Sequence, residues 1–120
     1  MAKKIVLVVD DQPGPRFVWR SILEGEGLSV VEAESGKEAF KIINQQNFVL
    51  IVSDIKMSSP MDGIEFLNKT KKLNSDILFI LTSGGHEWDR DRALSFGADD
   101  FIAKPAIKND IINCIKKYLG

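Results

Sequence analysis

The chain has 120 residues, 44% of them hydrophobic and 28% charged, and a formal net charge of −1, so it is long enough to bury the core of one globular domain. A net charge this small provides no overall field toward nucleic acid or an anionic membrane, and we expect neither direct nucleic-acid binding nor membrane insertion. The single cysteine, Cys114, excludes an internal disulfide, and no apolar run approaches the length of a signal peptide or a membrane span, so we expect a cytoplasmic protein.

Five short segments rich in Val, Ile and Phe recur along the chain. They are IVLVV (5–9), LSVVEA (28–33), FVLIVS (48–53), ILFIL (77–81) and DFIA (100–103). Three of them are apolar nearly throughout, which is typical of strands buried on both faces of a parallel sheet.

Segments with helical spacing separate these strands. In the second of them, Ser35 and Glu38 form a capping box, and Asp62 and Glu65 repeat this pattern before the third. The alternation of strand and helix, five times over, predicts a single doubly wound α/β domain over residues 1–120. The expected helices cover 15–24, 35–44, a segment that begins near Asp62, 87–96, and the run from Ile107 to Leu119.

Polar side chains follow four of the five predicted strands. The carboxyl ends of parallel strands meet at one edge of the sheet, where open α/β sheets form their binding sites. We therefore expect three carboxylates, a hydroxyl and an ammonium to converge there. The residues concerned are Asp10 and Asp11 after the first strand, Asp54 after the third, Thr82 and Ser83 after the fourth, and Lys104 and Pro105 after the fifth.

Three crowded carboxylates repel one another unless a cation neutralises them. Their oxygen atoms suit Mg²⁺, which takes only one or two carboxylates directly and leaves another free as a nucleophile that can form an aspartyl-phosphate. Lys104 could neutralise phosphoryl oxygens and Thr82 could donate a hydrogen bond to one of them. Taken singly, these residues have ordinary explanations as loop starts, helix caps or solvated side chains. Their joint placement at the carboxyl ends of different strands favours a shared Mg²⁺ and phosphoryl site over these separate explanations.

The segments VVDD, SDIKM…MDG, LTSG and GADDFIAKP together resemble the receiver domain of bacterial two-component response regulators. The resemblance covers essentially the whole chain. It implies a (βα)5 sheet with strand order 2-1-3-4-5 and a phosphoryl group donated by a sensor histidine kinase or a histidine phosphotransfer protein. It also implies a signalling phosphoacceptor that is not an enzyme and that carries no effector domain in this chain.

The same resemblance assigns roles to individual residues. Asp54 matches the phosphoacceptor, Asp11 the direct Mg²⁺ ligand, and Asp10 a ligand that acts through water. The backbone carbonyl of Lys56 would complete the protein ligands.

The resemblance also implies that Thr82 and Lys104 hold the phosphoryl oxygens. Phe101 falls at the aromatic switch position, and the Lys104–Pro105 bond is expected to be cis. Phosphorylation would then draw in Thr82, turn Phe101 inward, and change the face formed by the fourth helix, fifth strand and fifth helix. That face would bind a downstream protein target or an effector domain absent from this chain.

Three departures from the family pattern concern the neighbourhood of the site. The loop after Met57 has one extra residue, with Ser58 where a proline is usual and Pro60 two positions later. Pro15 stands where an apolar helix residue is common, so helix one is expected to begin at Pro15. Phe101 lacks the hydroxyl of the commoner tyrosine, so a switch there works by packing.

Other functions remain as alternatives. A flavodoxin-like FMN carrier has the same fold, but Asp10 and Asp11 would repel the phosphate after strand one. A pseudo-receiver keeps the fold as a protein-interaction module without phosphorylation, and only the loop insertion favours it. His86, the single histidine, is expected to be incidental, and HEWDR lacks the second histidine of a zinc motif.

Overall fold

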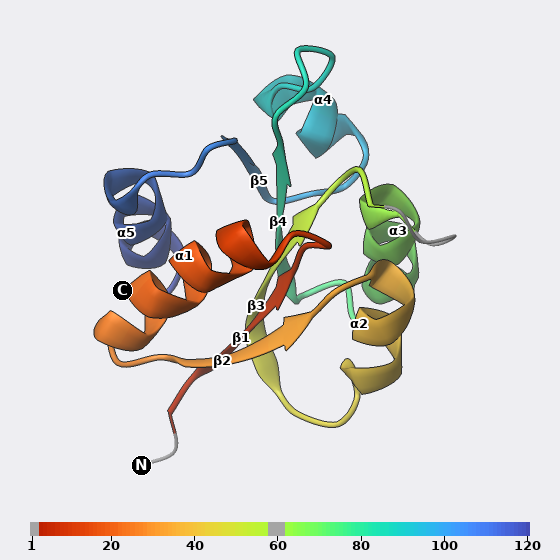
Figure 1. The fold of residues 1–120 in the computed structure, drawn as a ribbon. Helices are drawn as coiled ribbons and strands as arrows, with labels where there is room; N and C mark the ends of the chain where they lie inside the picture. The colour runs from red at the N-terminus through yellow and green to blue at the C-terminus, as the bar shows by residue number, and fades with distance from the viewer. Residues whose placement is uncertain (1–2, 58–61) are drawn as a thin grey trace.

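The computed structural model describes residues 3–57 and 62–120 and contains one five-stranded parallel sheet. The strand order β2-β1-β3-β4-β5 confirms the order expected from the sequence (Figure 1). The expected loop departure at Ser58–Pro60 lies outside the described residues. The strands are β1 (Ile5–Val9), β2 (Ser29–Ala33), β3 (Phe48–Asp54), β4 (Leu78–Ser83) and β5 (Asp100–Ala103).

A helix follows each strand, as the sequence predicts. The Ser35 hydroxyl accepts a hydrogen bond from the backbone N–H of Glu38, and the Asp62 carboxylate accepts one from Glu65, so both predicted caps are confirmed. The helices are α1 (Pro13–Gly25), α2 (Gly36–Ile42), α3 (Gly63–Leu73), α4 (Arg90–Ser95) and α5 (Lys108–Tyr118).

Helix α1 begins at Pro13, two residues before the expected start at Pro15. The first four N–H groups of a helix have no partner within it, so a proline in the first turn sacrifices no hydrogen bond. The first hydrogen bond of this helix runs from Arg16 N–H to the Gln12 carbonyl oxygen. Both prolines therefore fit within the first turn.

The sheet separates two apolar layers (Figure 1). On one face, Trp19 and Leu23 of α1 pack with Ile111 of α5. On the other, α2, α3 and α4 contribute buried side chains that include Phe66 and Ala93. Alternate residues of β1 and β3 enter opposite layers, which explains why these strands are apolar along their whole length.

Gly63 fixes the start of α3 against the end of β3. Its N–H donates to the Ile55 carbonyl oxygen at 2.9 Å, and a Cβ placed on Gly63 would lie 2.1 Å from the backbone oxygen of Asp54. No side chain tolerates such a contact with backbone, so only glycine lets the helix approach this closely. The position of Asp54 therefore depends on the absence of a side chain nine residues later.

We expect Gly63→Ala to lower the free energy of unfolding by about 3 kcal/mol, because the new methyl group must push α3 away from the end of β3. Urea denaturation followed by circular dichroism measures the change. Gly14→Ala is the matched control, since a Cβ at Gly14 meets nothing within 4 Å. Equal stability of both variants would contradict the close approach.

Candidate functional site

Three carboxylates converge at the carboxyl edge of the sheet, as the sequence predicts. Asp10 follows β1 directly, Asp11 comes next, and Asp54 is the last residue of β3. One carboxylate oxygen from each lies within 4.8 Å of the others. Asp10 and Asp54 are 4% and 7% exposed, so most of their negative charge is removed from water.

Lys104, from the end of β5, joins two of these carboxylates. Its Nζ lies 2.6 Å from Oδ2 of Asp10 and 3.1 Å from Oδ2 of Asp54. The Lys104–Pro105 peptide bond that follows is cis, as expected. The ammonium therefore supplies a counter-charge to the buried carboxylates from a strand that is distant in sequence.

Burial and mutual repulsion set the protonation behaviour of this cluster. Burial raises the pKa of Asp54 and the charge of Asp10 adds to this, while the Lys104 ammonium partly opposes both. Burial alone would lower the pKa of Lys104, but its hydrogen bond to Asp10 and the charges of Asp54 and Asp10 outweigh it and raise that pKa. The cluster therefore keeps Lys104 charged, and burial above all makes the charged form of Asp54 costly.

Thr82 and Phe101 lie on the two strands beyond Asp54. Thr82 pairs with Asp54 in the β3–β4 register and is 2% exposed. Phe101 pairs with Leu81, is half-buried, and packs against the apolar layer that α2, α3 and α4 cover. The structure thus brings Thr82 beside Asp54 and puts Phe101 at the margin of the core.

Lys56 lies two residues after Asp54, and its ammonium forms an ion pair with the carboxylate of Glu87. Glu87 belongs to the connection between β4 and α4, where Arg92 donates to the Glu87 carbonyl oxygen at 2.6 Å and stacks over Trp88. The hydrogen bond from Lys56 lowers the pKa of Glu87. The pair links the segment after β3 to the segment after β4.

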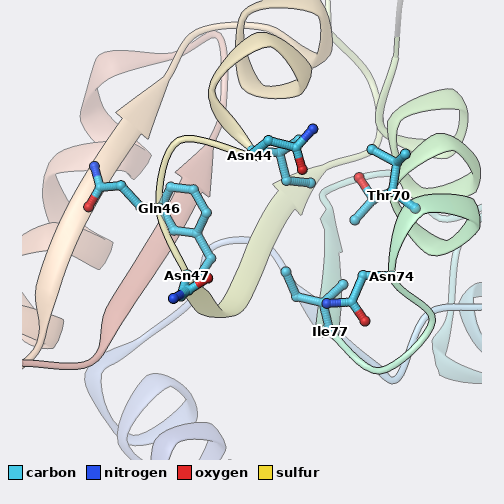
Figure 2. Close-up of a pocket in the computed structure, with 9 residues that line it drawn as sticks. Asn44, Gln46, Asn47, Thr70, Asn74 and Ile77 are labelled. Carbon is cyan, nitrogen blue, oxygen red and sulfur yellow. The ribbon is translucent and has the colours of Figure 1, made fainter.

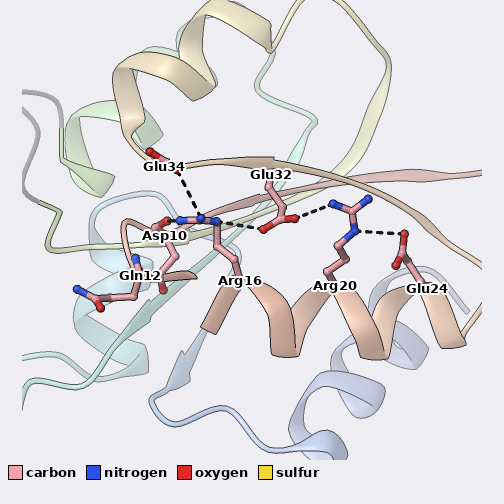
Figure 3. Close-up of polar contacts among 7 residues, drawn as sticks. All are labelled: Asp10, Gln12, Arg16, Arg20, Glu24, Glu32 and Glu34. Carbon is pink, nitrogen blue, oxygen red and sulfur yellow. Dashed lines mark hydrogen bonds and ion pairs between the residues drawn. The ribbon is translucent and has the colours of Figure 1, made fainter. Parts of the chain in front are cut away.

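Arg16 and Arg20 attach α1 to the strand ends around Asp10 (Figure 3). Arg16 donates to the Asp10 carbonyl oxygen at 2.6 Å and to Glu32 of β2 at 3.0 Å, and Arg20 donates to the other Glu32 oxygen at 2.6 Å. Glu34 lies 3.6 Å from Arg16 and is largely exposed. The Arg16 side chain is only 11% exposed, so its contacts hold the backbone that carries Asp10.

The donor set at this edge fits a magnesium ion. It consists of carboxylate oxygens, which are the hard ligands that Mg²⁺ prefers, and no sulfur or imidazole atom joins the acidic group found among the described residues. The excess negative charge left after the Lys104 contacts gives a divalent cation a favourable place. The geometry therefore accommodates both a cation and a negatively charged group beside Lys104.

A comparison with known protein families accounts for this arrangement. The sequence model of the response regulator receiver domain family matches residues 6–116. The chain belongs to this family.

Several known receiver domains resemble this one along nearly its whole length. A receiver domain protein from Methanospirillum hungatei is 32% identical, with a TM-score of 0.86 over 97% of this chain and 93% of that one. TrrA of Thermotoga maritima, solved in complex with Mg²⁺-BeF, is 31% identical, with a TM-score of 0.86 over 97% and 99%. These TM-scores show that the fold is shared over nearly the whole chain.

Curated relatives of the receiver domain differ in length. An uncharacterised 14.6 kDa protein of Leptolyngbya boryana is 35% identical over 98% of this chain and 92% of its own. The transcriptional regulatory protein SrrA of Staphylococcus aureus is 32% identical over 95% of this chain but only 47% of its own. The chain therefore spans less than half of that regulator.

Two further observations bear on the alternatives. His86 is exposed on the connection after β4, and none of the acidic or metal-ligating clusters in the described part of the chain contains it. Within residues 3–57 and 62–120, none of the helices is long and apolar enough to cross a membrane. Neither observation adds a second site to the receiver domain.

The sequence identified every member of the carboxylate cluster but not the charged residues that hold the neighbouring segments in place. Arg16 and Glu87 were missed because their partners, Glu32 and Lys56, lie on other elements and no motif or periodicity connects them. The one available signal was a pair of arginines at i and i+4 on the polar side of α1, which sequence alone cannot distinguish from solvated residues.

We expect Glu32→Gln to lower stability at neutral pH and to have little effect in acid. The hydrogen bond from Arg20 lowers the pKa of Glu32 in the folded protein, so its contribution is present above the ordinary glutamate pKa of about 4.3 and is lost as pH falls through the folded value. Thermal unfolding of both proteins between neutral pH and pH about 3 measures the difference. Glu34→Gln, at a largely exposed position, should change little at either pH; a Glu32→Gln difference independent of pH would contradict the mechanism.

Proposed function

We propose that this receiver domain accepts a phosphoryl group on Asp54 and passes the resulting change to protein partners. The observation that carries the proposal is the contact of Lys104 with the carboxylates of Asp54 and Asp10. An ammonium held beside a buried carboxylate can neutralise a group attached to that carboxylate. The partners that donate the group would be a sensor histidine kinase or a histidine phosphotransfer protein, the usual donors for receiver domains.

In the proposed reaction, an oxygen of Asp54 attacks the phosphorus of a phosphohistidine in line with the departing imidazole. An O–P bond forms, the N–P bond breaks, and the imidazole leaves with the electron pair of that bond. Lys104 neutralises charge on the phosphoryl oxygens and the Thr82 hydroxyl donates a hydrogen bond to one of them. Water later hydrolyses the acyl phosphate and restores the carboxylate, so the domain acts as a signalling phosphoacceptor.

Asp10, Asp11 and Asp54 would hold Mg²⁺ together with the backbone carbonyl oxygen of Lys56. When bound, the ion neutralises the negative charge shared by the carboxylates and the phosphoryl oxygens. The complex of the similar regulator TrrA with Mg²⁺-BeF supports this assignment.

An apolar groove beside Lys104 offers a place for the protein donor to dock. The groove has a volume of about 380 Å³. Phe17 and Ile107, next to its lining residues in sequence, are 68% and 56% exposed, which is a large apolar exposure beside a polar site. Its lining residues are Pro15, Val18, Trp19, Lys104, Pro105 and Ala106. A donor seated on this groove would lie next to Lys104, whose ammonium contacts the acceptor Asp54.

The proposed output lies on the face of α4, β5 and α5. Movement of Thr82 toward the phosphoryl group would leave space for Phe101 to turn inward, which shifts a population between two states of the same fold. The downstream partner would be a separate protein or an effector domain, since the relative SrrA is about twice as long as the matched region.

We expect one phosphoryl group on the wild-type chain and none on Asp54→Asn when each is incubated with acetyl phosphate and Mg²⁺. The amide keeps the shape of the carboxylate but lacks its nucleophilic charge. Intact-mass spectrometry measures the uptake, and chelation of Mg²⁺ by EDTA should abolish it in the wild type. Asp76→Asn is the matched control, because Asp76 is exposed and distant in sequence from the cluster.

Full uptake by Asp54→Asn would contradict the assignment of the acceptor. Absence of uptake by the folded wild-type protein would favour the pseudo-receiver alternative, in which the same fold binds partners without phosphorylation.

We expect Lys56→Ala to shorten the lifetime of the phosphoryl group several-fold. The long side chain and its charge, held by Glu87, would limit access of water to phosphorus. Mg²⁺ affinity should change little, because the proposed ligand at this position is the backbone oxygen. The rate of phosphoryl loss after removal of the donor measures the effect, with Lys72→Ala, an exposed lysine of α3, as control. Equal or slower loss from Lys56→Ala would show that the lysine provides no shielding.

A further inference from the structure

A second pocket lies at the edge of the sheet opposite the carboxylate cluster (Figure 2). It forms where β3 begins, whereas Asp54 stands where β3 ends. Its volume is about 250 Å³. Its lining comes from the connections before β3 and β4 and from the last turns of α3: Ile43, Asn44, Gln46, Asn47, Phe48, Thr70, Leu73, Asn74 and Ile77.

Thr70 supplies a buried hydroxyl that has no partner. The residue is 1% exposed, and its Oγ1 is the one buried side-chain polar atom without a hydrogen bond among the described residues. Figure 2 shows this oxygen on the side of the pocket, toward Asn44. Thr70 shares the inward face of α3 with Phe66 and Leu67, where an apolar side chain would be less costly. An unpaired buried hydroxyl is costly and calls for a partner.

Exposed carboxamide side chains also line this pocket. Within the described part of the chain, the side-chain amides of Asn44, Gln46 and Asn47 form no hydrogen bond with protein atoms. Asn74 uses its Oδ1 to accept from the Asp76 N–H at 3.0 Å, which leaves its NH₂ group available. The pocket therefore offers side-chain donors and acceptors whose hydrogen-bonding capacity is not fully used by contacts within the protein.

The remaining wall is apolar and the pocket carries no charge. Ile43, Phe48 and Ile77 are at most 9% exposed and belong to the core layer beneath α2 and α3. None of the described lining residues is charged. A charged ligand would lose its hydration here without a counter-charge, so the chemistry selects an uncharged one.

We propose that this pocket binds a neutral nucleobase-sized molecule that has adjacent donors and acceptors along one edge and an apolar face. Carboxamide side chains pair with the edge of adenine through one donor and one acceptor. A volume of about 250 Å³ lies below the usual range for larger ligands, which excludes a whole nucleotide. This proposal does not depend on phosphorylation of Asp54, because the two sites lie at opposite edges of the sheet.

The experiment is a titration of the ¹⁵N-labelled full chain with adenine, followed by ¹H–¹⁵N correlation spectra. We expect saturable shifts of the side-chain amides of Asn44 and Asn74. Thr70→Val should weaken binding about fivefold, the contribution of one hydrogen bond, without lowering the unfolding midpoint, while Thr70→Ser should bind as the wild type does. Purine, which lacks the exocyclic amino group, should bind about fivefold more weakly than adenine.

A second pair of variants keeps the test independent of the folding of Thr70→Val. Asn44→Ala should weaken adenine binding, whereas Gln45→Ala, at an exposed neighbouring position outside the lining, should not. Absence of saturable shifts up to the solubility limit of adenine would show a pocket filled by water alone and overturn the proposal. Equal binding of glucose and adenine, or no effect of Thr70→Val and Asn44→Ala, would overturn it as well.

Discussion

Repulsion among buried carboxylates is the constraint on which the rest of the molecule depends. Asp10 and Asp54 are almost fully buried and share the positive charge of Lys104, so the ends of β1, β3 and β5 must keep their relative positions for the ammonium to offset part of this charge. Contacts with neighbouring helices keep these strand ends in place. Gly63 lets α3 close against the end of β3, and Arg16 holds the backbone at the end of β1.

The two edges of the sheet pose opposite electrostatic problems. At the carboxyl edge, one ammonium offsets only part of the negative charge that the buried carboxylates bring together. At the amino edge, the pocket beside Thr70 contains neutral groups whose hydrogen bonds are incomplete. The same strands, β3 and β4, connect both edges through a core of apolar residues such as Ile51 and Phe79, so one rigid layer supports two chemically different surfaces.

Much of the fold could be predicted because its signals are local. Buried strands are apolar along their length, and the caps at Ser35 and Asp62 are spaced as capping boxes, so both kinds of element appear in short stretches of sequence. The carboxylate cluster was predictable because the carboxyl ends of parallel strands all lie at one edge of the sheet. Residues that directly follow these strands therefore meet there. The ion pair between Lys56 and Glu87 was not predictable, since exposed charged side chains can pair with many different partners. Helix α1 begins two residues before the expected Pro15, because a proline is compatible with several positions of the first turn.

The two prolines of α1 have a further consequence for anion recognition. A helix usually attracts anions at its start through the free N–H groups of its first turn, and this is how many α/β proteins hold the phosphate of a nucleotide or flavin cofactor. Pro13 and Pro15 each lack an N–H, so this end of α1 has lost two of those donors. The helix start that stands nearest the acidic pair is thereby made a poor phosphate cradle. The backbone at the start of α1 thus offers a phosphate group fewer N–H donors, independently of the negative charge of Asp10 and Asp11.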